Sequence, residues 1–90
     1  MNKQFNNNNN TGYCGWKNRS TWNVSLWISN DYGLYTTAVE FMKTYKGRKP
    51  YKDFIEYLEL EKEKTRDGIN WLDRSLGYRE LNWFMNELCK

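Results

Sequence analysis

The sequence predicts an all-α protein: a compact bundle of about four short helices that follows a disordered, Asn-rich N-terminal tail. Three observations lead to this fold class. Apolar residues recur at helical spacing in several segments, whereas only one segment makes a convincing strand. Turn-forming residues divide these segments, notably Gly47, Pro50 and the Asp67–Gly68 pair. The chain also has five Trp, seven Tyr and four Phe, so a few large rings can supply a dense core.

The 90 residues are enough for one domain at most. Residues 1–15 are expected to form a disordered tail, because a run of five asparagines offers little surface to bury. Residues 16–90 are expected to form a single helical domain. Tyr13 and Trp16 mark the point where the tail would dock on that domain.

The segment Asn18–Asn30, "NRSTWNVSLWISN", is open to two interpretations. As a strand it places four apolar residues on one face: Trp22, Val24, Leu26 and Ile28. As a helix it takes Asn18 as its N-cap and leaves only Ser25 and Ser29 as a polar edge, so most of its sides would be buried. We favour the helix, because a lone strand would leave its backbone donors and acceptors without partners.

The next two helices are bounded by turn residues. Asn30 or Asp31 is expected to cap a helix with apolar residues at spacings of four, four and three: Leu34, Ala38, Met42 and Tyr45. Gly47 suits a left-handed C-cap for it, and Pro50 suits the first turn of a new helix. This third helix is expected to extend over Tyr51–Lys64 and to present one apolar face: Tyr51, Phe54, Ile55 and Leu58.

Residues 65–76 are predicted to form a connector with a turn at Asp67–Gly68. Three apolar residues of this connector are expected to pack under it and hold it to the body: Ile69, Trp71 and Leu72. A last helix is predicted over Gly77–Cys89. Its apolar residues stand at i, i+3, i+4 and i+7, the clearest helical spacing in the chain: Leu81, Phe84, Met85 and Leu88.

Composition argues against most enzyme classes. The chain has no histidine, the commonest general acid or base and the commonest neutral metal ligand. Cys14 and Cys89, 75 positions apart, cannot by themselves complete a tetrahedral zinc site. The serines and threonines of the first helix have no base beside them. We therefore expect a protein without catalytic residues, metal or cofactor.

The same composition indicates where the protein resides. The N-terminal residues "MNKQFNNNNN" contain no apolar stretch of the kind found in secretory signals, and no run approaches the about 20 apolar residues of a membrane span. The expectation is a soluble, cytoplasmic protein whose Cys14 and Cys89 are reduced thiols. A disulfide between these two cysteines would tie the two termini together, but nothing in the sequence indicates an oxidising compartment.

Two weaker chemical alternatives remain. Asp31, Asp67 and Asp73 could together supply oxygen ligands for Mg²⁺ or Ca²⁺. The stronger interpretation is that each caps backbone donors at a turn or a helix start. Cys14, with Lys17 close by, could be a reactive thiol, but an ordinary small residue is the expected role.

Arg19 stands beside the Trp-rich segment and has two interpretations. Its guanidinium group could pair with Asp31 or Asp73, or stack on an indole ring. We expect a structural clamp between the first helix and the 67–73 connector, because arginine can bridge carboxylates. Recognition of a ligand or a protein at an exposed site is the alternative.

Basic residues cluster around the turn between the second and third helices, with two tyrosines among them: Lys43, Lys46, Arg48, Lys49, Lys52, Tyr45 and Tyr51. Lysine and arginine contact phosphates, and tyrosine rings can stack on bases. The total net charge is only +3, however, and acidic residues flank the cluster. Nucleic-acid binding through the 43–52 turn is therefore the alternative function.

Protein recognition is the leading function. Trp27 and Trp83 fall off the cleanest apolar stripes of their helices, and exposed aromatic residues make effective interface anchors. Together with Arg19, they are the candidate protein-binding residues. The competing explanation is that both tryptophans cover the core of a small domain, and it is the stronger one for Trp27.

The stretch "NRSTWNVSLWISNDYGLY", residues 18–35, resembles the signature of a family of small proteins encoded by bacteriophages, cyanophages among them, and by some bacteria. "YKDFIEYL" and "DGINWLDRSLGYRELN" resemble later parts of the same family, so the likeness extends over residues 18–88. The resemblance implies a phage-type accessory protein and transfers no activity. We expect a non-enzymatic protein in the host cytoplasm that binds a host or phage protein. Such binding could modulate host metabolism or defence.

Overall fold

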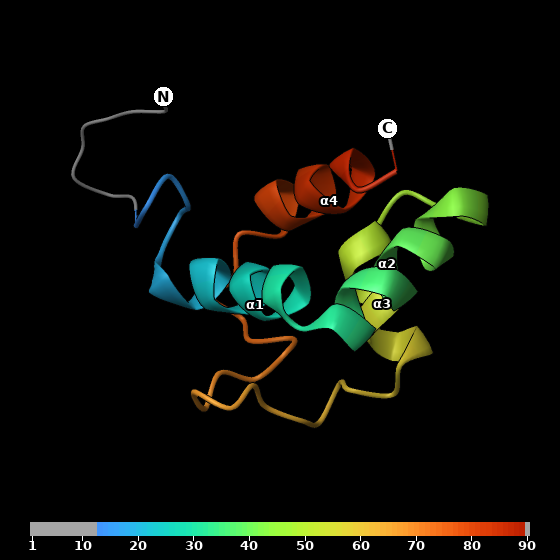
Figure 1. Ribbon diagram of the computed structural model, residues 1–90. Coiled ribbons are helices and arrows are strands. Elements are labelled where there is room, and N and C mark those ends of the chain that lie inside the picture. The colour runs from blue at the N-terminus through green and yellow to red at the C-terminus, as the bar shows by residue number, and fades with distance from the viewer. Residues whose placement is uncertain (1–12, 90) are drawn as a thin grey trace.

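The computed structural model describes residues 13–89, which form four α-helices and no strand (Figure 1). The helices are α1 (Arg19–Asn30), α2 (Tyr32–Thr44), α3 (Pro50–Tyr57) and α4 (Tyr78–Glu87). The all-α prediction is confirmed. Residues 1–12 of the predicted tail lie outside the described residues. Residues 13–15, which were also assigned to the tail, belong to a defined turn that packs on the helices.

The first quoted segment is a helix, so the interpretation that we favoured is confirmed. Asn18 is its N-cap, with extended backbone (φ −157°) and a side-chain oxygen that accepts from the Thr21 N–H at 2.9 Å. Val24 and Ile28 are fully buried. The expected polar edge is partly wrong, because Ser25 is buried and its hydroxyl group donates to the Trp22 carbonyl at 2.7 Å. Ser29 is exposed, as expected.

One residue ends α1 and begins α2. The backbone N–H of Asp31 donates to the Trp27 carbonyl at 3.0 Å, and its carboxylate accepts from the Leu34 N–H at 2.9 Å. The predicted cap at this position is therefore confirmed. Because a single extended residue separates the two helices, the chain turns sharply and α2 packs against α1.

The second helix ends at Thr44, earlier than predicted, and Gly47 is not its left-handed cap. Tyr45 determines this turn: its hydroxyl group donates to Asp53 at 2.6 Å and accepts from the Lys49 N–H at 3.0 Å. A side chain at Gly47 would collide with that hydroxyl group. Glycine is therefore needed here for a close approach. Pro50 opens α3, as predicted.

The third helix stops at Tyr57, seven residues before its predicted end at Lys64. The Leu60 N–H donates to the Ile55 carbonyl and the Glu59 N–H to the Glu56 carbonyl, both at 3.0 Å. These two bonds form a Schellman C-cap, with Glu59 in the left-handed position (φ 59°). Glycine normally occupies that position, so the sequence carries no signal for this helix end.

The connector from Leu58 to Gly77 runs along one edge of the bundle and returns beside α1 to reach α4 (Figure 1). Its turn at Asp67–Gly68 is confirmed: the Gly68 N–H donates to the Thr65 carbonyl at 2.9 Å, with φ 90° at Gly68. Trp71 is buried, and Ile69 and Leu72 are partly buried against the core, also as predicted.

The core lies where all four helices and the connector meet. Its largest fully buried side chains are Tyr51, Phe54, Ile28, Ile55, Leu81, Met85 and Val24. The hydroxyl group of Tyr51 donates to the Trp71 carbonyl at 2.6 Å, so the polar end of this buried ring has a partner. No helix within residues 13–89 has the length and apolar character needed to cross a membrane.

Candidate functional site

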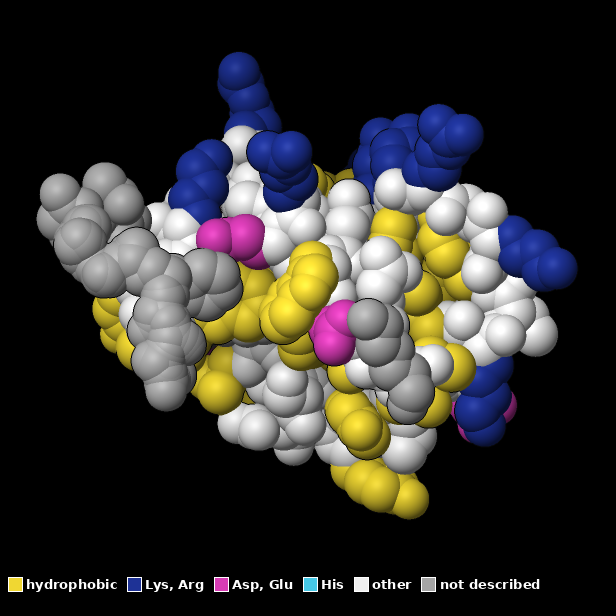
Figure 2. Space-filling model, turned by 90° about the horizontal axis from the view of Figure 1, so that it is seen from above, with side chains coloured by type: hydrophobic (Ala, Val, Ile, Leu, Met, Phe, Trp, Pro, Cys, Tyr) yellow, Lys and Arg dark blue, Asp and Glu magenta, His cyan; other side chains and the backbone are white. Residues whose placement is uncertain are grey.

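An aromatic hollow lies where the N-terminal turn meets α4, and we call it the tryptophan groove. It has a volume of about 550 Å³ and is lined by Cys14, Gly15, Trp16, Arg79, Glu80 and Trp83. Trp83 is 57% exposed, which is unusual for so large an apolar ring. In Figure 2, hydrophobic side chains gather across the middle of the face that carries α4, with Lys and Arg along its upper and right sides.

Local structure holds one wall of the tryptophan groove in place. Tyr13 and Trp16 exchange both of their backbone hydrogen bonds, at 2.6 and 2.8 Å, around a two-residue turn. Cys14 (φ 52°) and Gly15 (φ 88°) supply the left-handed backbone that such a turn requires. The Trp16 ring then meets Phe84 edge to face, with centroids 5.9 Å apart. The docking point predicted at Tyr13 and Trp16 is thereby confirmed.

The position of Trp83 on α4 explains why its ring faces outward. Leu81 and Met85 are fully buried, and Phe84 is partly buried against the core. Trp83 lies on the other side of this helix. Glu80, at the rim of the groove, accepts a hydrogen bond from the Lys17 N–H at 2.7 Å. Its carboxylate is thus engaged, whereas Arg79 is exposed and forms no ion pair among the described residues.

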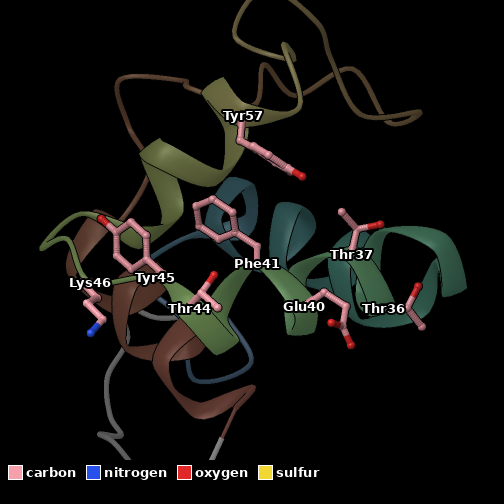
Figure 3. A pocket seen from close by; sticks show the side chains of 8 residues that line it. All are labelled: Thr36, Thr37, Glu40, Phe41, Thr44, Tyr45, Lys46 and Tyr57. Atoms are coloured by element: carbon pink, nitrogen blue, oxygen red, sulfur yellow. The ribbon is translucent and has the colours of Figure 1, made fainter.

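A second hollow, of about 580 Å³, lies between α2 and α3 (Figure 3). In Figure 3 the Phe41 ring lies between the rings of Tyr45 and Tyr57, with threonines along the α2 side. Phe41 stacks on Tyr45 at 5.2 Å and also touches the buried Phe54 at 5.3 Å. The hydroxyl group of Thr36 bonds to carbonyls of its own helix. This hollow therefore offers apolar contact more than hydrogen bonding.

The basic side chains of the predicted turn have different surroundings in the structure. Lys43 pairs with Glu40 at 2.9 Å, and this hydrogen bond raises the Lys43 pKa. Lys46 lines the hollow of Figure 3, whereas Lys49 and Lys52 line a different one beside α4. Arg48 is exposed.

The two tyrosines of this turn do not present free rings. The prediction that Tyr51 stacks on a base is wrong, because its ring is fully buried in the core. Burial raises the pKa of Tyr51 far above its ordinary value. Tyr45 is partly buried against Phe41, and burial followed by the hydrogen bond to Asp53 raises its pKa as well. Both rings serve the fold.

The connector is clamped to α1, but not by Arg19 as predicted. Asn23, which is 1% exposed, donates to the Asp67 carboxylate at 2.7 Å and accepts from the Thr65 hydroxyl group at 2.8 Å. The indole N–H of Trp27 donates to the same carboxylate at 3.1 Å. The side chain of Arg19 is exposed and makes no hydrogen bond or ion pair within residues 13–89.

Trp27, one of the protein-binding candidates, thus contributes to the fold. It is partly buried against the core, and the guanidinium group of Arg66 lies 5.7 Å from the centroid of its ring. Of the three candidates, Trp83 combines large exposure with a place in one of the hollows described for residues 13–89. Sequence reasoning did not single out Arg79 or Glu80, because their place beside Trp16 depends on how the N-terminal turn docks.

The aspartates that were considered as metal ligands each bind protein donors. Asp31 caps α2, Asp67 binds Asn23 and Trp27, and Asp73 accepts from the N–H and the hydroxyl group of Ser75 at 2.8 and 2.6 Å. No group of three or more potential metal-binding side chains occurs within residues 13–89. Cys14 and Cys89 are free, exposed thiols.

The Asp67 network predicts a loss of stability in acid. The hydrogen bonds from Asn23 and Trp27 lower the Asp67 pKa below 3.8, with a smaller contribution from the charge of Arg19. A lowered pKa means that this stabilisation is present above pH 3.8 and is lost as the pH falls through the pKa of the folded state. Asp67→Asn should therefore be less stable than the wild type near about pH 6, and the difference should shrink towards about pH 2.

Urea unfolding of both proteins at several pH values measures this difference. Trp27→Phe removes one of the two side-chain donors to Asp67. The free energy of unfolding of Trp27→Phe should therefore fall less steeply in acid than that of the wild type, but more steeply than that of Asp67→Asn. If the wild type and Asp67→Asn lose stability in parallel, the Asp67 carboxylate does not act as described.

Comparison with known proteins identifies a family but no individual relative. No curated protein and no solved structure was found to match the chain. One protein-family model matches residues 9–90, which is nearly the whole sequence and includes every described helix. The chain belongs to this family, which is described as a family of unknown function (DUF7249).

Proposed function

We propose that this protein is a non-enzymatic accessory protein that binds another protein through the tryptophan groove. The observation that carries this proposal is the position of Trp83. It is 57% exposed on a domain that fully or partly buries most of its other large apolar side chains, and it lies beside Trp16 in a hollow of about 550 Å³. Exposed tryptophans next to a hollow are typical anchors of protein interfaces.

The rim of the groove indicates the chemistry of the partner. Trp16 and Trp83 offer apolar ring surface, and the edge carries the exposed guanidinium group of Arg79. The Glu80 carboxylate is occupied by the Lys17 N–H. A partner segment with an aliphatic or aromatic side chain next to a carboxylate would match this arrangement, because arginine binds carboxylates with two parallel hydrogen bonds.

The resemblance of residues 18–88 to small phage-encoded proteins supports a host or phage protein as the partner. On this proposal the protein acts in the host cytoplasm, and modulation of host metabolism or defence would follow from occupying a host protein. This step rests on analogy with other phage accessory proteins and not on the geometry of the groove.

Nucleic-acid binding through the whole 43–52 turn is the weaker candidate. The buried ring of Tyr51 and the Lys43–Glu40 pair remove part of the surface on which it depended. Lys49 and Lys52 retain exposed charges on a separate face.

Trp83→Ala is expected to abolish or strongly weaken partner binding without unfolding the protein. Truncating an interface anchor costs about 2 kcal/mol or more, which corresponds to about 30-fold in Kd. The test is affinity capture from nuclease-treated host lysate with the wild type and Trp83→Ala in parallel, followed by titration of any captured protein. Circular dichroism confirms that the variant remains helical.

Tyr32→Ala is the matched control, because Tyr32 is 82% exposed but lines none of the three hollows described for residues 13–89. A protein captured by the wild type and Tyr32→Ala but lost with Trp83→Ala supports the proposal. Equal recovery of the same proteins on all three baits would refute it.

A further inference from the structure

A third hollow, of about 610 Å³, lies between the start of α3, the end of the connector and α4, and we call it the basic hollow. Its lining residues are Lys49, Lys52, Leu72, Arg74, Tyr78 and Asn82. They come from three segments that are distant in the sequence, so no single stretch of the chain reveals the site. The tryptophan groove shares none of these residues.

The basic hollow carries three positive charges and, among its described lining residues, no carboxylate. Lys49 and Arg74 are exposed and form no ion pair within the described part of the chain. The carboxylate nearest to Lys52 is that of Glu56, at 4.0 Å, the outer limit of an ion pair, with both side chains 47% exposed. A pair of this kind contributes little. The positive charge of the hollow is therefore largely uncompensated.

The backbone adds to this field. Lys49 is the N-cap of α3 and provides no side-chain cap, so the positive end of the helix dipole lies beside the hollow. The Asp53 carboxylate in the first turn of α3 offsets part of this positive charge. The Tyr51 N–H donates to the side-chain oxygen of Asn82 at 3.0 Å, which ties α3 to α4. With that oxygen engaged, the remaining polar atoms of the Asn82 amide are N–H donors. A negatively charged ligand could accept hydrogen bonds from the amide nitrogen of Asn82.

One side of the basic hollow is apolar. Leu72 and the ring of Tyr78 contribute to its lining, and both pack against the core. The hydroxyl group of Tyr78 donates to the Asp73 carbonyl at 2.8 Å, which fixes the ring in position. A flat ring beside lysine and arginine side chains is the combination with which proteins hold a base next to its phosphate.

We propose that the basic hollow binds a phosphate group joined to a planar ring, as in a nucleotide. A phosphate monoester carries about −1.5 to −2 charges and three acceptor oxygens. Three cations and the Asn82 donors match this charge and these acceptors better than they match a single carboxylate. The nucleotide could be free or could be the end of a nucleic-acid strand. The chemistry at the hollow is the same in both cases.

The test is a titration of ¹⁵N-labelled full-length protein, followed by amide shifts, with inorganic phosphate, adenosine, adenosine monophosphate and a short single-stranded oligonucleotide as probes. Adenosine monophosphate should shift amides near the start of α3, the 72–78 segment and Asn82, and adenosine should not. Lys49→Ala and Arg74→Ala, which truncate exposed side chains, should each weaken binding by about tenfold.

Lys62→Ala is the matched control, because it removes one exposed positive charge outside the basic hollow. It should change the affinity by less than about twofold, since distant exposed charges are screened by salt. Equal losses in Lys62→Ala and Lys49→Ala, or equal shifts with adenosine and adenosine monophosphate, would overturn the proposal.

The two sources of the phosphate give different results. Tighter binding of the oligonucleotide, with a steep dependence on salt, assigns the site to a strand. Equal affinity for the mononucleotide assigns it to a free nucleotide. Trp83→Ala should bind the probes like the wild type, so failure at the basic hollow and failure at the tryptophan groove can be distinguished.

Discussion

Replacing Phe54 by alanine is expected to lower the free energy of unfolding by about 3–5 kcal/mol. Phe54 is fully buried in α3, and its ring touches Phe41 with centroids 5.3 Å apart. Truncation removes apolar contact and leaves a cavity that a closely packed core cannot fill completely. Small domains are stable by about 5–15 kcal/mol in total, so this loss is a large fraction of the total. Urea unfolding followed by circular dichroism measures the change.

Tyr57→Ala, one turn later on the same helix, is the control. Tyr57 is 64% exposed and touches Phe41 at its surface side, at 5.2 Å. Loss of one aromatic pair should cost no more than about 1.5 kcal/mol. Similar losses in the two variants would show that α3 does not anchor the core through Phe54.

The elements that the sequence predicted well are those whose signals are local. Asn18 and Asp31 carry side chains that cap the residues just after them, so α1 and α2 begin where expected. Leu81 and Met85 lie one turn apart in α4 and are both buried. These features depend on neighbours within four residues, which a single sequence contains.

The elements that were predicted wrongly depend on distant partners or on an unusual residue. The end of α2 is determined by the contact of Tyr45 with Asp53 across the next turn, and the end of α3 by Glu59 in a conformation that usually requires glycine. Asn23 was given no role from the sequence, yet it is buried and binds Thr65 and Asp67. An Asn within an apolar helix is the signal that was available, but its partners are more than 40 residues away.

The same distinction between local signals and distant contacts holds for the candidate sites. Exposure of Trp83 follows from its place opposite the apolar stripe of α4, so the sequence could identify it. The companions of Trp83 in the tryptophan groove, Trp16 among them, are brought in by the docking of the N-terminal turn. Arg74 joins Lys49 only through the path of the connector. Single residues were therefore predictable, whereas their grouping required the fold.

The contacts of Asn23 with Thr65 and Asp67, which join α1 to the connector, can be tested by substitution. Asn23→Ala leaves the buried Thr65 hydroxyl group without its acceptor, and we expect a loss of about 1–3 kcal/mol. Asn23→Asp keeps the shape of the side chain but replaces the donor to Asp67 by a second carboxylate. Two carboxylates in contact repel each other and leave oxygen facing oxygen, so Asn23→Asp should be less stable than Asn23→Ala at neutral pH.

The pH dependence of Asn23→Asp should have the opposite sign to that of the wild type. The new pair raises the pKa of at least one carboxyl group above its value in the unfolded chain, because a shared proton relieves the repulsion. A raised pKa means that stability is present below the unfolded-state pKa and is lost as the pH rises through the folded-state pKa. Asn23→Asp should therefore approach the wild type in acid, whereas the wild type itself loses the contribution of Asp67 there. Urea unfolding of the wild type, Asn23→Ala and Asn23→Asp between acid and neutral pH tests this prediction. If another residue, such as Arg19, held the connector to α1, the two Asn23 variants would be equally stable at every pH.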